Sequence, residues 1–193
     1  MSMKLAVSGD RGSFSEEAGL LYSQRVGREA ELFFATDMEG VLSRVEKGEA
    51  DQGIFPVVNS RGGLVHTAFK AMGKHLFELV DEVWFDVHQC LMTLPDLDRS
   101  GIRKIVSHPQ AIAQCERYLA REFENIPLEE WDDTAKAAKD LAEGILPPNA
   151  AVIAPARSAQ IYNLKMIASG IQDNHPNLTT FIVVKKKGSN PLI

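Results

Sequence analysis

The chain contains few cysteines and no long hydrophobic segment. Its two cysteines, Cys90 and Cys115, belong neither to a CxxC pair nor to a histidine cluster. We therefore expect two buried thiols in a reducing compartment, with no metal site and no cofactor. No apolar stretch approaches the roughly 20 residues that span a membrane, and the chain does not open with a signal-peptide pattern. These absences exclude a disulfide-stapled secreted domain and predict a cytoplasmic protein.

An excess of one charge sign is also absent. The formal net charge is −5, with acidic and basic residues interspersed, so nothing favours nucleic acid or an anionic membrane as a partner. The one basic run, Lys185, Lys186 and Lys187, follows an apolar segment. We interpret it as the solvated end of an edge strand, where lysines discourage aggregation.

The remaining composition is that of a globular protein. The 193 residues are 45% hydrophobic and 24% charged, which is typical of folded rather than disordered chains. This length allows one large domain or two small lobes.

Short apolar runs alternate with helical patterns through the first part of the chain. Ser13 and Glu16 fit a capping box, so a helix should begin at Phe14. This alternation indicates parallel βαβ units and an α/β fold. Strands are expected at 3–8, 31–35 and 52–58, and helices at 14–26, 37–49 and 65–74.

The segment 76–92 breaks this rhythm and is too long for one ordinary strand, so we interpret it as extended chain that crosses between two lobes. A second α/β series follows, and a strand at 178–187 must return to a sheet. In the second series, strands are expected at 102–107, 126–131, 150–154 and 164–169, and helices at 109–123, 134–143 and 155–162, with His108 capping the first. The predicted first lobe is 1–83 plus 171–193, and the second is 84–170.

Two such lobes leave a cleft between them, and ligands of open α/β sheets bind beyond the carboxyl ends of strands. Three polar loops fall at such ends, at 9–15, 56–63 and 107–111, and the threonine-bearing stretch 174–184 is a fourth candidate wall. Each also has a purely structural reading: glycines that permit a tight turn, side chains that cap a helix, an exposed first helical turn, or an ordinary strand entry.

Taken together, the four segments resemble the prephenate dehydratase family in order and over nearly the whole chain. The family pattern G-P-E-G-T-F-S-E-E-A corresponds to G-D-R-G-S-F-S-E-E-A at 9–18, and P-I-E-N-S-x-E-G-x-V to P-V-V-N-S-R-G-G-L-V at 56–65. The pattern S-H-P-Q-A-x-A-Q-C is intact at 107–115, a Thr-A-x-A-A helix start lies at 134–138, and I-x-D-x-x-x-N-x-T-R-F corresponds to I-Q-D-N-H-P-N-L-T-T-F at 171–181.

The resemblance implies a bilobal fold similar to type II periplasmic binding proteins. It also implies a lyase that removes water and CO2 from prephenate to give phenylpyruvate, in phenylalanine biosynthesis. Thr179 would act on the departing hydroxyl, and a small-molecule dicarboxylate would be the partner. We expect the terminal strand to present Thr179 across the cleft from Asn59 and Gln110. The residues that would line the pocket or hold a carboxylate are Asn59, Ser60, Gln110, Ser13 and Thr134.

The chain departs from the family at charged positions. Thr180 replaces the arginine of T-R-F, Val58 replaces the glutamate of E-N-S, and Gly62 replaces a later glutamate. Loss of both the Val58 and Thr180 charges is consistent with removal of one buried ion pair, because losing a single partner is costly. Arg11 and Arg61 are the candidates for a replacement cation.

Three functions stay open at this point. The first is dehydration of prephenate, or of arogenate, which the sequence does not separate. The second is decarboxylation of prephenate without aromatisation, and the third is a binding or regulatory protein that kept the cleft and lost the chemistry. Dimers recur in the family, so the resemblance implies a homodimer. The family's usual C-terminal ACT domain, which binds phenylalanine, does not follow Ile193 in the sequence, so we expect no feedback by that route.

Overall fold

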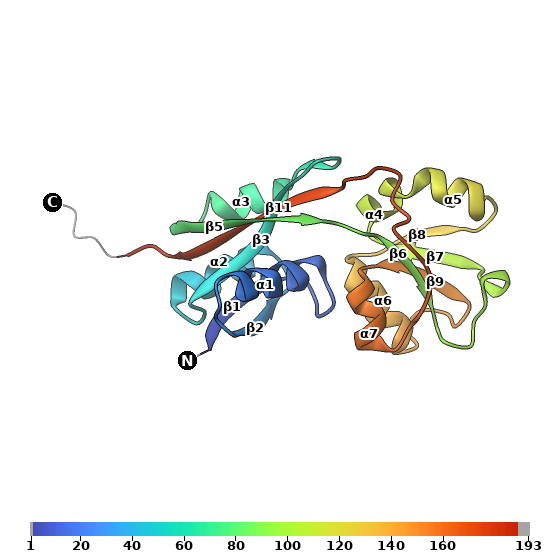
Figure 1. The fold of residues 1–193 in the computed structure, drawn as a ribbon, viewed down its shortest axis with the longest axis horizontal. Helices are drawn as coiled ribbons and strands as arrows, with labels where there is room; N and C mark the ends of the chain where they lie inside the picture. The colour runs from blue at the N-terminus through green and yellow to red at the C-terminus, as the bar shows by residue number, and fades with distance from the viewer. Residues whose placement is uncertain (1, 189–193) are drawn as a thin grey trace. The chain divides into compact units, whose positions relative to one another are not determined.

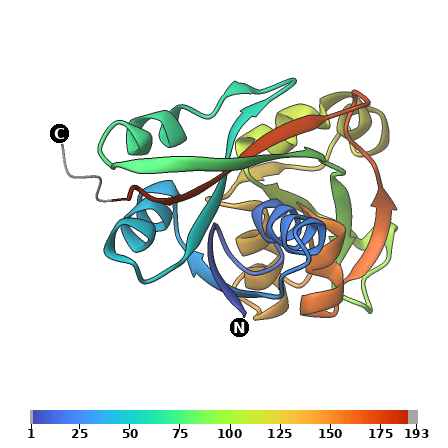
Figure 2. The ribbon, with the colours of Figure 1, turned by 60° about the vertical axis from the view of Figure 1, so that its left-hand side comes forward.

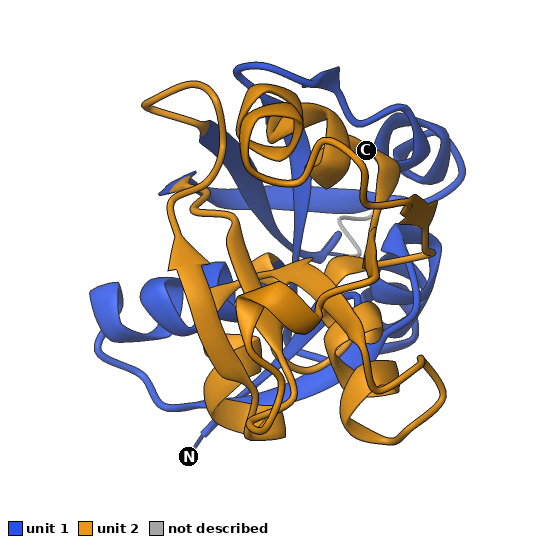
Figure 3. Ribbon diagram, turned by 90° about the vertical axis from the view of Figure 1, so that its right-hand side faces the viewer, with its two compact units in different colours: residues 1–9, 15–85, 178–193 blue, residues 10–14, 86–177 orange. Residues whose placement is uncertain are grey.

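The structure is a computed structural model that describes residues 2–188. It divides into two compact units (Figure 3). Unit 1 comprises residues 2–9, 15–85 and 178–188 of the described chain, and unit 2 comprises 10–14 and 86–177. The α/β class is as predicted. The boundaries differ, because 10–14 and 171–177 belong to unit 2 and not to the first lobe, and 84–85 belong to unit 1 and not to the second.

Unit 1 is built on a six-stranded mixed sheet in the order β2–β1–β3–β11–β5, with β4 paired to β3 (Figure 1). Strand β1 pairs in parallel with β2 and β3, whereas β11 is antiparallel to β3. The terminal strand therefore returns to the first unit, as predicted, but to an inner position. The lysines at its end are exposed without protecting a sheet edge, so that interpretation was wrong. The strands are β1 (Met3–Ser8), β2 (Ala30–Ala35), β3 (Gln52–Asn59), β4 (Gly63–Leu64), β5 (Phe77–Asp86) and β11 (Leu178–Lys186).

Helices cover both faces of this sheet. Helices α2 (Met38–Lys47) and α3 (His66–Met72) pack their buried side chains against Phe55 and Val57 on one face. Helix α1 (Phe14–Arg25) lies on the other, where a Cβ added at Gly19 would be 3.2 Å from a Val7 methyl carbon. Glycine at this position therefore allows the helix to approach the strands closely.

His75 follows α3 and joins it to α2 through two glutamates. Its Nδ1 lies 2.7 Å from the Glu46 carboxylate and its Nε2 lies 3.0 Å from the Glu39 carboxylate, which also pairs with Lys74. The hydrogen bond to Glu46 and then that to Glu39 raise the pKa of His75 against the opposing effect of burial. The imidazolium is thus favoured in the folded protein.

Unit 2 is built on a five-stranded sheet in the order β10–β6–β9–β7–β8. Helices α6 (Thr134–Ala142) and α7 (Ala156–Tyr162) cover one face, and α4 (Pro109–Gln114) and α5 (Glu116–Glu122) cover the other. Residues 170–177 then run on from β10 into β11 (Figure 2). The strands are β6 (Cys90–Thr93), β7 (Lys104–Ser107), β8 (Leu128–Glu130), β9 (Ala150–Ala154) and β10 (Lys165–Ser169), and a 3₁₀ turn lies at Arg99–Gly101.

One predicted helix, 109–123, is interrupted at Cys115. The Asp173 carboxylate accepts hydrogen bonds from the backbone N–H groups of Arg117 (2.9 Å) and Tyr118 (3.2 Å). These amides therefore have a side-chain acceptor at the start of a new helix. The Asp173 N–H donates to the Gln114 carbonyl at 2.7 Å. The same contacts hold the segment 171–177 in unit 2.

Both cysteines are buried and free, as predicted. Burial, together with the nearby Asp173 and Cys90 groups, raises the pKa of the Cys115 thiol to about 12. Within residues 2–188, no helix combines the length and the apolar character that crossing a membrane requires.

Candidate functional site

Antiparallel pairing of β3 with β11 brings two predicted site residues together. Thr179 lies opposite Asn59, and Thr180 lies opposite Val58. The next residue of β11, Phe181, pairs with Pro56, so Val57 of β3 is left out of the register and a bulge forms. Proline lacks a backbone N–H, so a bulge is a suitable place for it within a sheet. Thr179 is therefore beside Asn59 in unit 1, and the prediction that a cleft separates these two residues was wrong.

The Asn59 side chain joins the hairpin turn after β3 to the threonine strand. Its Oδ1 accepts hydrogen bonds from the backbone N–H groups of Arg61 (2.9 Å) and Gly62 (2.7 Å). Its Nδ2 donates to the Thr179 hydroxyl oxygen at 2.8 Å and to the Leu178 carbonyl at 3.3 Å. Because two backbone donors identify the oxygen, the orientation of the amide is determined. Asn59 thus closes a hairpin turn and does not cap a helix.

Ser60 holds the residue that precedes Thr179. Its backbone N–H donates to the Leu178 carbonyl at 2.7 Å, and its hydroxyl accepts from the Leu178 N–H at 3.0 Å. Within residues 2–188, the Thr179 hydroxyl bonds to the Asn59 amide, and it accepts that bond. Its own proton remains available to a further acceptor.

Val58 and Thr180 are the two positions at which the sequence interpretation expects the loss of one buried ion pair. Their direct pairing in the register confirms that the two positions are neighbours. Thr180 is buried, so a lone charge there would carry a desolvation cost. The joint absence of both charges avoids that cost.

In unit 2, α7 anchors the loop 10–14. The Ser158 hydroxyl donates to the Gly12 carbonyl at 3.0 Å, and the Tyr162 hydroxyl donates to the Arg11 carbonyl at 2.7 Å. Gly12 has φ +91°, and an added Cβ would lie 2.7 Å from Ser158 Oγ. Glycine is therefore favoured both by the positive φ angle and by the close approach of Ser158 Oγ. Ser13 is buried and the Arg11 side chain is exposed.

The starts of α4 and α6 carry the other predicted residues of unit 2. His108 caps α4, as predicted, and its Nδ1 accepts from the N–H of Gln110, whose side chain is exposed. Asp133 caps α6 just before the buried Thr134, accepting from two backbone amides. Burial raises the pKa of Asp133, and Asp10 raises it further, against the effects of those amides and of His108.

A buried amide network in unit 2 was missed by the sequence interpretation. Gln114 Oε1 accepts from Gln89 Nε2 and from Asn177 Nδ2, each at 3.0 Å. The Gln172 oxygen accepts from the Gln89 backbone N–H at 2.9 Å. Gln114, Gln172 and Asn177 all lie inside the motifs quoted above. Those motifs could therefore have identified them as candidate functional residues.

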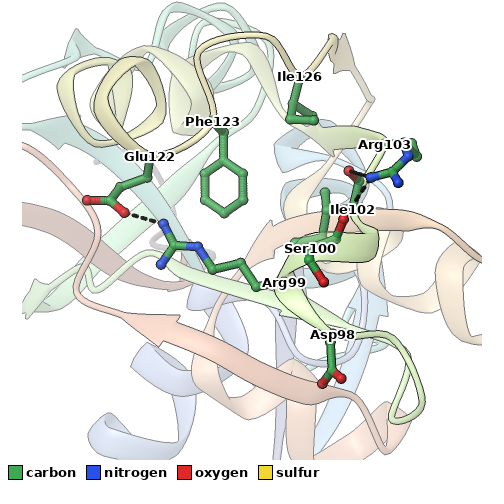
Figure 4. A pocket seen from close by; sticks show the side chains of 8 residues that line it. All are labelled: Asp98, Arg99, Ser100, Ile102, Arg103, Glu122, Phe123 and Ile126. Carbon is green, nitrogen blue, oxygen red and sulfur yellow. Dashed lines mark hydrogen bonds and ion pairs between the residues drawn. The ribbon is translucent and has the colours of Figure 1, made fainter.

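None of the predicted site residues lines the cavity of about 640 Å³ in unit 2 (Figure 4). There the Arg99 guanidinium lies 4.9 Å from the centre of the Phe123 ring and pairs with Glu122. The lining residues are Asp98, Arg99, Ser100, Ile102, Arg103, Glu122, Phe123 and Ile126. In the described part of the chain, no group of three or more His, Cys, Asp or Glu side chains is arranged to hold a metal ion.

Two α/β units, each a sheet covered by helices on both faces, define the fold class of the chain. A transporter structure from Parabacteroides distasonis has this fold, with a TM-score of 0.53 at 12% identity over 96% of this chain and 66% of that one. A sequence model of prephenate dehydratase matches residues 5–189. The chain belongs to the prephenate dehydratase family.

Individual relatives agree with this assignment. Arogenate dehydratase 1 of Petunia hybrida is 36% identical over 96% of this chain. The structure of prephenate dehydratase from Arthrobacter aurescens in complex with L-Phe superposes with a TM-score of 0.86 at 26% identity over 98% of this chain. The chain spans 43% of the length of the first relative and 62% of the second.

Proposed function

We propose that this protein is a dehydratase of prephenate or arogenate, with Thr179 as the catalytic hydroxyl. In the reaction, the bond from ring carbon C1 to its carboxylate breaks and CO2 leaves. The electron pair enters the ring, the C4–O bond breaks, and the departing hydroxide, stabilised by a hydrogen bond from Thr179, takes a proton from solvent to become water. Aromatisation drives the step, so positioned donors suffice.

The observation that carries the proposal is the direction of the bond between Asn59 and Thr179. Because Asn59 Nδ2 donates to Thr179 Oγ1 at 2.8 Å, the Thr179 hydroxyl can donate a hydrogen bond to a leaving oxygen. A threonine hydroxyl is a weak acid but a good hydrogen-bond donor. Positioned donors of this kind contribute about 2.7–4 kcal/mol in comparable sites.

The substrate also carries carboxylates, and we propose that Arg61 or Arg11 binds one of them. The Arg61 backbone N–H donates to Asn59 Oδ1, and the Arg61 side chain is exposed. Neither arginine forms an ion pair with any residue within 2–188. Ser13, Gln110 and Thr134 are the proposed neutral ligands. Each arginine should be replaced by methionine separately, and the variant with the larger rise in KM identifies the cation.

The activity is tested by incubating the wild-type protein with prephenate and, separately, with arogenate. Chromatography should detect phenylpyruvate or phenylalanine above the uncatalysed rate. A dihydroaromatic product that keeps its hydroxyl would instead identify a decarboxylase. Absence of any product at high protein concentration would reject both enzymatic functions.

A binding protein without turnover is the second candidate, because the paired positions Val58 and Thr180 carry no charge. Calorimetry with prephenate, phenylpyruvate and phenylalanine separates the two candidates. Tight binding without product formation supports the second. Turnover of either substrate excludes it.

A further inference from the structure

We propose that Asn59 is a positioning residue that fixes the direction of the Thr179 hydroxyl bond, and is not itself a substrate ligand. This inference rests on the proposed function, and it changes the role that the sequence motif suggests for Asn59. It concerns residues of unit 1 alone.

The hydrogen-bonding capacity of the Asn59 amide is fully used. A side-chain amide offers two acceptor sites and two donors. The acceptor sites of Oδ1 are taken by the N–H groups of Arg61 and Gly62, and the donors of Nδ2 by Thr179 Oγ1 and the Leu178 carbonyl. A substrate group could bind Asn59 only by displacing one of these bonds. Asn59 is also 4% exposed, so such a displacement would leave a polar group beside this buried side chain without its partner.

The arrangement sets the direction in which Thr179 can act. A hydroxyl rotates freely about its C–O bond unless a partner occupies one side. Here an N–H donor occupies that side at 2.8 Å, so the hydroxyl proton must point elsewhere. Ser60 also fixes the backbone before Thr179, because it hydrogen-bonds both the N–H and the carbonyl of Leu178. The threonine is therefore held at its side chain and at the residue before it.

A purely structural role for Asn59 predicts different contacts. Closing the hairpin turn needs only Oδ1 and the two backbone N–H groups. An aspartate would keep this turn, since it retains that oxygen. The hydrogen bond from Asn59 Nδ2 to Thr179 is not needed to close the turn. The isosteric replacement Asn59→Asp tests this hydrogen bond.

The first test is a kinetic double-mutant cycle of Asn59→Ala and Thr179→Val, with folding checked by thermal melts and amide spectra. Asn59→Ala should lower kcat about 100-fold, by analogy with loss of one oriented donor, and should change KM less than threefold. In the Thr179→Val background, it should change kcat less than threefold, because the group it positions is gone. Fully multiplicative losses, or a tenfold rise in KM with little change in kcat, would overturn the proposal.

Asn59→Asp is the second variant and preserves the turn. An ionised carboxylate at this position accepts from the threonine and so consumes its proton, whereas a protonated carboxyl can donate as the amide does. After subtraction of the uncatalysed rate, its kcat relative to wild type should rise as pH falls through the pKa of the introduced carboxyl. The pKa of the introduced carboxyl should be measured by nuclear magnetic resonance titration, and a ratio that stays flat through that pKa contradicts the positioning role.

A readout without turnover keeps this inference separate from the proposed function. In nuclear magnetic resonance spectra, the Asn59 side-chain amide signals should move in Thr179→Val and stay close to wild type in Thr179→Ser. Equal spectra for the two variants would disprove the contact. If the wild type forms no product, the proposed function fails, and these spectra still decide whether Asn59 holds Thr179.

Discussion

Replacing Gly12 by alanine should destabilise the protein by an amount that the structure separates into two parts. Alanine at φ +91° incurs backbone strain of about 1–2 kcal/mol. The added Cβ would also lie 2.7 Å from Ser158 Oγ, which must move and lose its hydrogen bond to the Gly12 carbonyl, a further cost of about 0.5–1.5 kcal/mol. The sum is about 1.5–3.5 kcal/mol.

Thermal denaturation measures this effect. For a chain of this size, each kcal/mol lowers Tm by about 2–4 °C, so the predicted fall for Gly12→Ala is about 3–14 °C. Gly27→Ala is the matched control, because Gly27 has φ +65° and no heavy atom within 4 Å of an added Cβ. It should show the strain alone. Equal melting temperatures for the two variants would refute the contact with Ser158, and an unchanged Tm for Gly12→Ala would refute both parts.

Three further outcomes are expected. Because the folded-state pKa of His75 is raised, its stabilisation is complete below the unfolded pKa of about 6.5 and is lost as pH rises through the folded value. The difference in stability between wild type and His75→Gln should thus shrink with rising pH, and a difference that grows would contradict this. Cys115, with a pKa raised to about 12, should resist a thiol reagent at pH 8 until the protein unfolds, so rapid modification of the native protein would be inconsistent with its burial. Thr180→Arg alone should lower Tm, and adding Val58→Glu should recover part of the loss, because the two positions are opposite in the register; additive losses in the double variant would argue against a shared pair.

The regular elements could be predicted because their signals are local. The apolar run after Thr180 predicts a strand whatever its partners are. Its inner position between β3 and β5 could not be predicted in the same way, since pairing depends on residues far away in the sequence. That is why the lysines at its end were misinterpreted as protecting an edge.

The break at Cys115 shows the same limit in a helix. The local sequence has continuous helical spacing from Pro109 onward. The carboxylate that bonds the amides of Arg117 and Tyr118 comes from Asp173, 56 and 55 residues away. A non-local acceptor therefore starts a new helix where propensity alone would continue the old one.

For the site, the motifs identified residue types but not their contacts. Asn59 and Thr179 were both selected from the sequence, yet they were placed on opposite walls. Antiparallel pairing makes them neighbours, and only the coordinates show that the amide donates to the hydroxyl. The direction of that bond is the physical basis of the proposed chemistry.

The most direct test of that chemistry compares turnover of prephenate and arogenate by wild type, Thr179→Val and Thr179→Ser. Valine keeps the volume and removes the hydroxyl, so kcat should fall about 100- to 1,000-fold. Because Asn59 Nδ2 loses one acceptor, Tm should also fall by about 2–12 °C. Serine keeps the hydroxyl and should retain most of the activity. A valine variant that keeps kcat within threefold of wild type would contradict the role of Thr179 as the hydrogen-bond donor to the departing hydroxyl.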